Sequence, residues 1–271
     1  MKVWVLGSGS RGNAVVVESG ECRVMIDVGF GPRILQKRLE ACGIAPESIE
    51  ACVITHEHSD HIRGAARAAR RWHWPLFASE GTYANSRLAE LGTPAATFVA
   101  GRTLEFSEMD VTTFRVPHDA SEPIGVLATA TNTGARAAVV TDIGHASRTV
   151  RTMVREVDIL VLESNHDEEM LANGPYPPYL QRRIASRVGH LSNRDCADLV
   201  RESISPHLRQ VVLAHLSEEN NTPRLAFESM RSALGGTGFR GAVLPALQDG
   251  VIGPFSVTAG TGRVSQLTLG I

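Results

Sequence analysis

The chain has 271 residues, and its 27 Lys and Arg nearly balance its 29 Asp and Glu, so the formal net charge at pH 7 is −2. This balance excludes a protein that is basic overall, and a nucleic-acid partner would have to be bound by a local patch. The length suits one large domain with a substantial core, and we expect a single domain over residues 1–271.

The N-terminal apolar run is too short for a signal peptide, and no run approaches the length of a membrane span. We therefore expect no membrane partner. Four cysteines are scattered without CxxC spacing, which predicts reduced, mostly buried thiols and a cytoplasmic location: Cys22, Cys42, Cys52 and Cys196. Nothing in the sequence indicates an oligomeric state.

Apolar runs and turn residues predict the elements in chain order. Strands are expected at 2–6, 14–18, 23–26, 51–55, 76–78, 97–99, 103–106, 110–115, 125–130, 136–141, 158–162, 209–214, 242–244 and 255–257. Helices are expected at 33–42, 62–71, 81–91, 146–155, 178–188, 193–204 and 222–234. The strands come first as meanders and later alternate with helices, which favours two stacked sheets with helices outside.

One loop carries the densest chemistry. The segment His56-Glu57-His58-Ser59-Asp60-His61 holds four metal-capable side chains within six residues, between an apolar strand and a helix. A loop on a rigid scaffold can direct several ligands at one point. Imidazole suits zinc, and mixed His/Asp sites also accept manganese and iron. The segment predicts a metal site.

This pattern resembles that of the metallo-β-lactamase-fold hydrolases. The resemblance continues at Asp27, His118, Asp142 and His215, each of which follows a short apolar run. It implies an α/β fold, the four-layer αββα sandwich, with two mixed sheets, helices outside and the metals at one edge. It also implies a metal-dependent hydrolase.

The resemblance implies a ligand set for two divalent ions, with zinc favoured and manganese or iron open. One ion would be held by His56, His58 and His118, the other by Asp60, His61 and His215, and Asp142 would bridge both. Asp27 would orient a ligand histidine through its other ring nitrogen. A bridging water would become a hydroxide that attacks phosphorus or a carbonyl. We expect Asp60 and His190 to act in catalysis.

Six further segments resemble the bacterial YycJ/WalJ-like group. They are Gly7–Asn13, Val116–Ala120, Glu163–Asp167, Gly174–Pro177, Gly189–Asn193 and Leu216–Pro223. The distal half is also similar to ribonuclease Z. The group implies a cytoplasmic phosphodiesterase with DNA as its favoured nucleic-acid substrate, acting as a 5′→3′ exonuclease.

The ribonuclease Z pattern makes His190 the general acid for the leaving oxygen. The alternative is that His190 only satisfies a backbone group near a helix start. Ser192 or Asn193 would cap that helix, whose free amides suit a phosphate. Asn165 and His166 would support a metal ligand or contact a phosphate. The glycine-serine loop 7–13 offers further amides, although a plain turn explains it as well.

The sequence leaves two interpretations for each of two arginine clusters and for two tyrosines. Arg182, Arg183, Arg187 and Arg194 would either follow a DNA backbone or form a solvated surface. Arg63, Arg67, Arg70 and Arg71 have helical spacing, and we expect them to be a solvated charged face. Tyr176 and Tyr179 would stack on bases or stiffen a loop.

Two alternatives to a nuclease stay in view. One is a small-molecule metallohydrolase that acts on a cyclic phosphodiester, lactone or thioester. The other is a non-catalytic, metal-binding regulatory module. A true β-lactamase is disfavoured, because Asp142 stands where many zinc β-lactamases have a cysteine.

Overall fold

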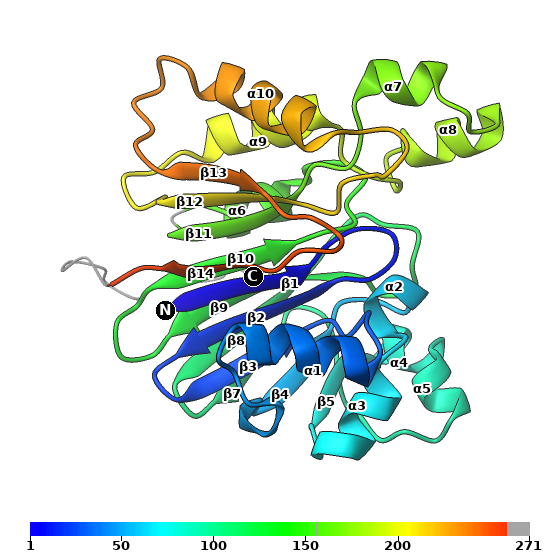
Figure 1. The fold of residues 1–271 in the computed structure, drawn as a ribbon, viewed down its shortest axis with the longest axis vertical. Coiled ribbons are helices and arrows are strands. Elements are labelled where there is room, and N and C mark those ends of the chain that lie inside the picture. The colour runs from blue at the N-terminus through cyan, green and yellow to red at the C-terminus, as the bar shows by residue number, and fades with distance from the viewer. Residues whose placement is uncertain (156, 259–271) are drawn as a thin grey trace.

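The computed structural model describes residues 1–155 and 157–258, and in this part of the chain two seven-stranded sheets stack on each other (Figure 1). The first sheet has the order β14-β1-β2-β3-β4-β5-β6. Its strands are β1 Lys2–Gly7, β2 Ala14–Ser19, β3 Cys22–Ile26, β4 Ala51–Ile54, β5 Leu76–Ser79, β6 Ala96–Phe98 and β14 Ile252–Ser256. The pairs from β14 to β3 are antiparallel and those from β3 to β6 are parallel.

The second sheet has the order β13-β12-β11-β10-β9-β8-β7. Its strands are β7 Thr103–Phe106, β8 Met109–Arg115, β9 Ile124–Ala130, β10 Arg136–Val140, β11 Ile159–Glu163, β12 Gln210–Ala214 and β13 Ala242–Pro245. The pairs from β7 to β10 are antiparallel, and those from β10 to β13 are parallel. Both sheets are therefore mixed.

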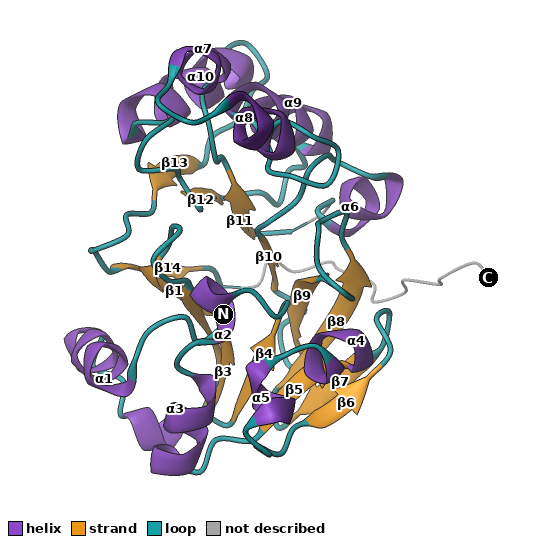
Figure 2. Cartoon of the chain, turned by 90° about the vertical axis from the view of Figure 1, so that its right-hand side faces the viewer, coloured by secondary structure: helices purple, strands orange, loops and turns teal. Residues whose placement is uncertain are grey.

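Helices cover the outer face of each sheet (Figure 2). Beside the first sheet lie α1 Pro32–Ala41, η1 Pro46–Ser48, α2 Ser59–Ile62, α3 Ala65–Trp72, α4 Glu80–Ala84 and α5 Arg87–Glu90. Beside the second lie α6 Arg148–Met153, α7 Glu168–Asn173, α8 Pro178–Ile184, α9 Asn193–Ser203 and α10 Pro223–Leu234. The four-layer αββα sandwich expected from the sequence is confirmed.

Three hydrophobic cores separate the four layers. Alternate residues of one strand serve different cores, because successive side chains of a strand point to opposite faces. Val3 and Val5 of β1 face the second sheet, whereas Trp4 and Leu6 pack with α1 and α3. The third core joins the second sheet to α6, α9 and α10. Each sheet is thus buried on both faces, which holds the strand ends at a fixed edge.

Some predicted helices differ from the structure. The helix expected at 62–71 begins at Ala65 as α3, and Arg63 and Gly64 separate it from the short helix α2, Ser59–Ile62. A Cβ on Gly64 would lie 1.8 Å from the carbonyl oxygen of Phe30, so this close approach requires glycine. The helix expected at 81–91 is also split, because Ser86 accepts a hydrogen bond from the Leu88 amide and starts α5. Helix α7, capped by Asp167, was not expected.

No helix in the described ranges is both long and apolar enough to cross a membrane.

Candidate metal centre

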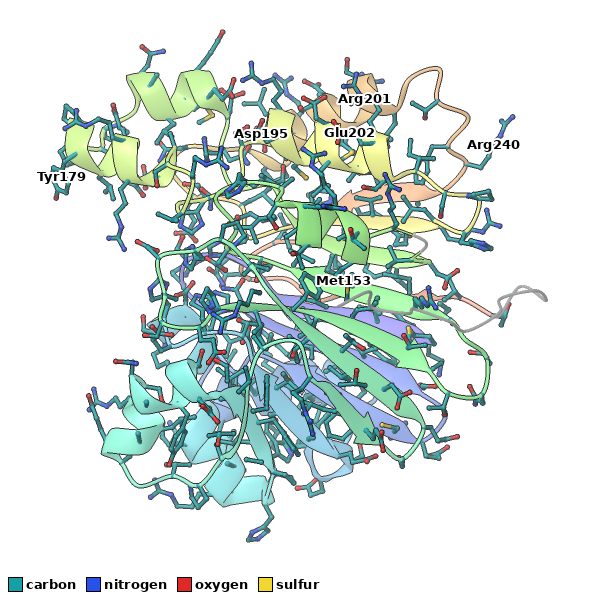
Figure 3. All side chains as sticks on the ribbon, turned by 180° about the vertical axis from the view of Figure 1, so that it is seen from behind. Met153, Tyr179, Asp195, Arg201, Glu202 and Arg240 are labelled. Carbon is teal, nitrogen blue, oxygen red and sulfur yellow. The ribbon has the colours of Figure 1, made fainter. Side chains whose placement is uncertain are left out.

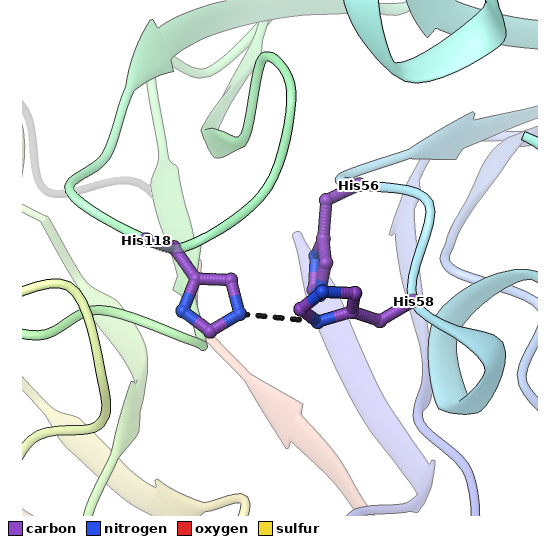
Figure 4. Close-up of side chains that lie close together, drawn as sticks. All are labelled: His56, His58 and His118. Atoms are coloured by element: carbon purple, nitrogen blue, oxygen red, sulfur yellow. Dashed lines mark hydrogen bonds between the residues drawn. The ribbon is translucent and has the colours of Figure 1, made fainter. Parts of the chain in front are cut away.

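Three histidines from two loops form the first cluster (Figure 4). His56 and His58 follow β4, and His118 follows β8. Nε2 of His118 lies 3.2 Å from Nδ1 of His58. Nε2 of His56 is buried and has no hydrogen-bond partner among the described residues. The three rings present nitrogen donors that lie within 4.8 Å of one another.

A second cluster contains the carboxylates. Oδ2 of Asp60 lies 3.3 Å from Nε2 of His61 and 3.3 Å from Nε2 of His215. Asp142 reaches both clusters: Oδ2 lies 3.0 Å from Nε2 of His61, and Oδ1 lies 3.9 Å from Nε2 of His118. The structure therefore brings together all seven residues for which metal ligation was predicted.

The donor spacing fits divalent metal ions. Two ligands on one tetrahedral zinc, each about 2.0–2.1 Å from the ion, lie about 3.3 Å apart. The contacts His118–His58, His61–Asp60, His215–Asp60 and His61–Asp142 are 3.0–3.3 Å long. Such close, buried nitrogens and carboxylates without a counterpart are costly unless a cation joins them. The His/Asp set therefore implies divalent metals.

Each of four histidines is oriented by a partner on its outer side. Asp27 Oδ2 lies 2.7 Å from His61 Nδ1, as expected for a residue that orients a ligand. Nδ1 of His56 lies 3.0 Å from Thr55 Oγ1, and Nδ1 of His118 lies 3.1 Å from the Gly189 carbonyl oxygen. Such outer bonds fix the tautomer and direct Nε2 toward the ion.

Glu163 is the fourth outer partner and was missed as a site residue. It ends β11 and is completely buried. Its Oε1 accepts from Nδ1 of His215 at 2.9 Å and from Nδ1 of His190 at 2.8 Å, while Oε2 accepts from the amides of Ile143 and Leu191. Both oxygens are thus engaged by hydrogen bonds, and Glu163 also lies with Asp142, His190 and His215 in a group that could hold a metal ion. Its place in the segment Glu163–Asp167 was the only signal in the sequence.

The pKa values of three site carboxylates are lowered, which favours the deprotonated form that a metal ligand requires. Burial raises the pKa of Glu163, but the charge of His190 and the two imidazole hydrogen bonds outweigh it and lower the pKa to about 2. Burial likewise raises the pKa of Asp142, and the neighbouring His215 and His61 overcome this and hold it well below its usual range. The pKa of Asp60 is lowered in the same way by His61 and His215.

Three site residues have a left-handed backbone. In the described ranges, only four non-glycine residues have positive φ, and three of them are Asp27 at 62°, Asp142 at 55° and His215 at 53°. Each follows the end of a strand: β3, β10 and β12. This conformation is unfavourable for residues with a Cβ, though Asp and His tolerate it better than most. The turn redirects the chain at the sheet edge and exposes the side chain to the cluster.

The glycine-serine loop 7–13 contributes to the site through side chains as well. Asn13 Nδ2 lies 3.2 Å from Asp60 Oδ2 and 3.1 Å from His61 Nε2. Ser8 Oγ accepts from the His215 amide at 2.8 Å. The sequence predicts only that backbone amides of this loop are available to a phosphate, and it does not single out Asn13 or Ser8.

The other predicted supporting residues lie behind the metal donors. Asn165 donates to the His215 carbonyl oxygen at 2.8 Å. Ser192 caps α9 through a bond from the Asp195 amide. Asn193 is buried and bonded to Ser164 and Asn221, which suits support of the loop rather than a substrate contact. His166 is buried beside His190 on the wall of a 290 Å³ cavity.

Of the arginines and tyrosines considered for DNA binding, two arginines are held in ion pairs and the two tyrosines differ in their surroundings. Arg183 is paired with Asp119 at 2.7 Å, and Arg194 with Glu168 at 3.0 Å. Tyr176 lines a 240 Å³ cavity together with His58 and His190. Tyr179 is 68% exposed and projects from α8 away from the sheets (Figure 3).

Known proteins have sequences similar to this chain. The model of the beta-lactamase superfamily domain matches residues 22–216. Exodeoxyribonuclease YycJ of Bacillus anthracis is 34% identical over 239 residues, which cover 87% of this chain and 89% of that protein. Exodeoxyribonuclease WalJ of Streptococcus pneumoniae is 34% identical over 238 residues, 86% of this chain and 88% of that protein.

Solved structures with low sequence identity share the fold. The metallo-beta-lactamase fold protein YhfI from Bacillus subtilis has a TM-score of 0.67 at 16% identity, covering 93% of this chain and 98% of that one. The short form of human tRNase Z has a TM-score of 0.64 at 17% identity, covering 94% and 99%. Together with the ligand edge, these matches establish that the chain belongs to the beta-lactamase superfamily, within its metal-dependent, metallo-β-lactamase-fold hydrolases.

Proposed function

We propose that this protein is a dinuclear metal-dependent phosphodiesterase that acts on DNA in the cytoplasm as a 5′→3′ exonuclease. The observation that carries this proposal is the bond from His190 to the buried Glu163, beside a complete set of metal donors. The relatives named exodeoxyribonuclease, at 34% identity over most of both chains, support the choice of substrate.

Two ions would be held by His56, His58, His118, Asp60, His61, Asp142 and His215. When bound, they would supply Lewis-acid activation of the phosphate and a water of lowered pKa as the nucleophile. The chain's own contribution is to hold the donors at fixed spacing. Asp60 belongs to this step, because its Oδ2 lies 3.3 Å from Nε2 of both His61 and His215 and would complete one ligand group with them.

His190 would protonate the leaving oxygen. Its Nδ1 donates to Glu163 Oε1 at 2.8 Å, which fixes the ring and leaves Nε2 for the substrate. The side chain is 23% exposed, whereas the side chains of the neighbouring His118 and His215 are 1% and 3% exposed. An imidazolium in this position can donate a proton to an alkoxide as the phosphodiester bond breaks. Glu163 would stabilise that cation.

The surroundings of His190 favour an extended substrate. One cavity of 290 Å³ and another of 240 Å³ are both lined by His190. The first also contains His166 and Ser192, and the second contains His58 and Tyr176. A chain that crosses His190 would occupy both, whereas a small ester would fill only one.

The test is cleavage of 5′- and 3′-labelled single- and double-stranded DNA by chelated protein to which zinc or manganese is returned. We expect metal-dependent loss of nucleotides from the 5′ end, abolished in Asp142→Ala. His207→Ala, which changes a histidine outside the site, should behave as wild type. Absence of cleavage under every condition, with turnover of generic esters, would identify a small-molecule hydrolase instead.

The role of His190 is tested by the leaving group. His190→Ala should lower DNA cleavage by about 10²–10⁴-fold, the usual contribution of a general acid. The loss should be far smaller for bis(4-nitrophenyl) phosphate, because nitrophenolate departs without a proton. Equal losses on both substrates would contradict the assignment.

A further inference from the structure

A basic cavity of about 520 Å³ adjoins the metal-binding loop and is used by none of the steps above. Four arginines line it: Arg63, Arg67, Arg70 and Arg87. The first three lie on the α2–α3 segment, and Arg87 begins α5, which Figure 2 shows beside α3. Their helical spacing in the sequence predicts an ordinary solvated face for Arg63, Arg67 and Arg70. The position of α5 turns that face into one wall of a cavity.

The charge of this cavity is not neutralised within the described part of the chain. No carboxylate there lies within salt-bridge distance of Arg67, Arg70 or Arg87, whereas Arg11, Arg23 and Arg183 elsewhere are all paired. Arg63 donates to the carbonyl oxygens of Arg11 and Gly29 and so braces the loop. Glu57 is the one acid on the wall, so the four arginines leave an excess of positive charge. Its Oε1 accepts from the Ser121 amide and hydroxyl, and its Oε2 has no hydrogen-bond partner among the described residues.

Apolar side chains also line the cavity. They are Ile62, Ala66, Leu88 and Leu91, of which Leu91 is 54% exposed. A ligand that fits must therefore carry several negative charges and also flat or apolar groups. A polynucleotide has this combination, with phosphates that pair with arginine and bases whose faces cover apolar side chains.

The cavity adjoins the loop that carries metal-capable side chains. Glu57 and Ser59 line it and are sequence neighbours of His56, His58 and Asp60, which belong to the donor clusters and do not line it. A strand bound at the donor clusters and a strand bound in the cavity would therefore contact the same loop.

We propose that Arg67, Arg70 and Arg87 bind the backbone phosphates of the DNA strand that continues from the scissile linkage. This inference rests on the proposed function, since it assigns the track by which the same substrate approaches the metals. It also explains how a chain of net charge −2 can bind a polyanion, because the positive charge is concentrated where the strand runs.

The experiment compares zinc-loaded wild type with the triple variant Arg67→Gln/Arg70→Gln/Arg87→Gln. Binding of a fluorescent single-stranded oligonucleotide, protected at both ends by phosphorothioates, is measured from low to high salt. We expect affinity at low salt to fall at least tenfold. The slope of log K against log salt should become shallower by about 2, because each lost single-strand phosphate contact removes about 0.7.

The matched control is Arg71→Gln. Arg71 lies on the same helix, donates to Gln36 and packs over Trp72 away from the cavity. It should keep the wild-type slope. Thermal unfolding and zinc content, measured on every variant, check that the fold is intact.

A scan with neutral methylphosphonate linkages locates the contact. In wild type, two or three consecutive substitutions should weaken binding, and the triple variant should be insensitive to the same substitutions. If the triple variant keeps the wild-type slope and scan while wild type cleaves DNA, this inference is wrong and the proposed function stands. If wild type neither binds nor cleaves DNA, both are wrong.

Discussion

His190 and His215 bind the same carboxylate oxygen: Oε1 of Glu163 accepts from the Nδ1 atoms of both rings, at 2.8 and 2.9 Å. One of these histidines faces a cavity, and the other completes the metal cluster. The position of the proposed general acid is thereby tied to the position of a metal ligand. A change at Glu163 must affect both.

Glu163→Gln should impair both the general acid His190 and the metal ligand His215, whereas a change at His190 should impair the general acid alone. An amide has one acceptor, so its NH₂ group must face either the two imidazoles or the amides of Ile143 and Leu191. We expect kcat to fall by at least about 10²-fold, and metal affinity to fall about 10–100-fold. His190→Gln should lower kcat alone. Equilibrium dialysis and steady-state kinetics provide the measurements, and unchanged metal affinity in Glu163→Gln would contradict the shared role.

Asp27→Asn should weaken metal binding without unfolding the protein. Oδ1 of Asp27 must stay an acceptor for the Thr55 amide, so the new NH₂ would face His61 Nδ1 and reverse its tautomer. The proton would then lie on Nε2, toward the metals. We expect about 10–100-fold weaker binding. Asp27→Ala should also lower stability by about 1–2 kcal/mol, because alanine is strained at φ 62°. Equal melting temperatures for the two variants would argue against this strain.

Gly29→Ala should displace the loop that carries Asp60. An added Cβ would lie 1.8 Å from the Asp60 carbonyl oxygen and 2.5 Å from the Asn13 amide nitrogen. We expect a loss of about 1–3 kcal/mol together with weaker metal binding. Gly31→Ala is the control two residues away, since nothing lies within 4 Å of its Cβ, and it should change stability by less than about 0.5 kcal/mol. Similar melting curves for both variants would refute the close-approach argument.

Removal of the metals should lower the melting temperature, because the donors come from both sheets. Metal at 100 times its Kd stabilises the folded state by about 2.7 kcal/mol, which corresponds to about 5–10 °C for a chain of this size. Calorimetry with and without chelator measures the shift. His56→Ala should lose most of it, and His207→Ala should keep it all. If the melting temperature of the wild-type protein is the same with and without chelator, no ion is bound.

The sheet edge that carries the metal-capable side chains could be predicted, because these side chains follow apolar strands and the end of an apolar strand is easily located in a sequence. Asp27, Asp142 and His215 are the first polar residues after β3, β10 and β12, or nearly so. The sequence pattern therefore placed them correctly at one edge. The metal-binding roles of Asp142 and His215 and the orienting role of Asp27 remain predictions to be tested by variants at these positions.

Glu163 and the arginine cavity could not be predicted for a physical reason. Glu163 and His215 are 52 residues apart, and they meet because β11 and β12 pair in parallel with Glu163 opposite Ala214. Register of this kind depends on tertiary packing. The cavity likewise depends on the position of α5 beside α3. The sequence predicts one continuous helix over 81–91, whereas in the structure a new helix begins after Ser86 and places Arg87 on the cavity wall.

The pairing of β1 with β14 has a consequence for synthesis. Val3 is opposite Phe255, so β1 has as its neighbour a strand that is synthesised 252 residues later. Until then one edge of β1 is open, and such an edge can pair with other chains. Because this contact joins residues far apart in the sequence, the first sheet is completed only after β14 has been synthesised. Nascent chains should therefore depend on protection of β1, and truncation before residue 252 should yield aggregates rather than a smaller folded enzyme.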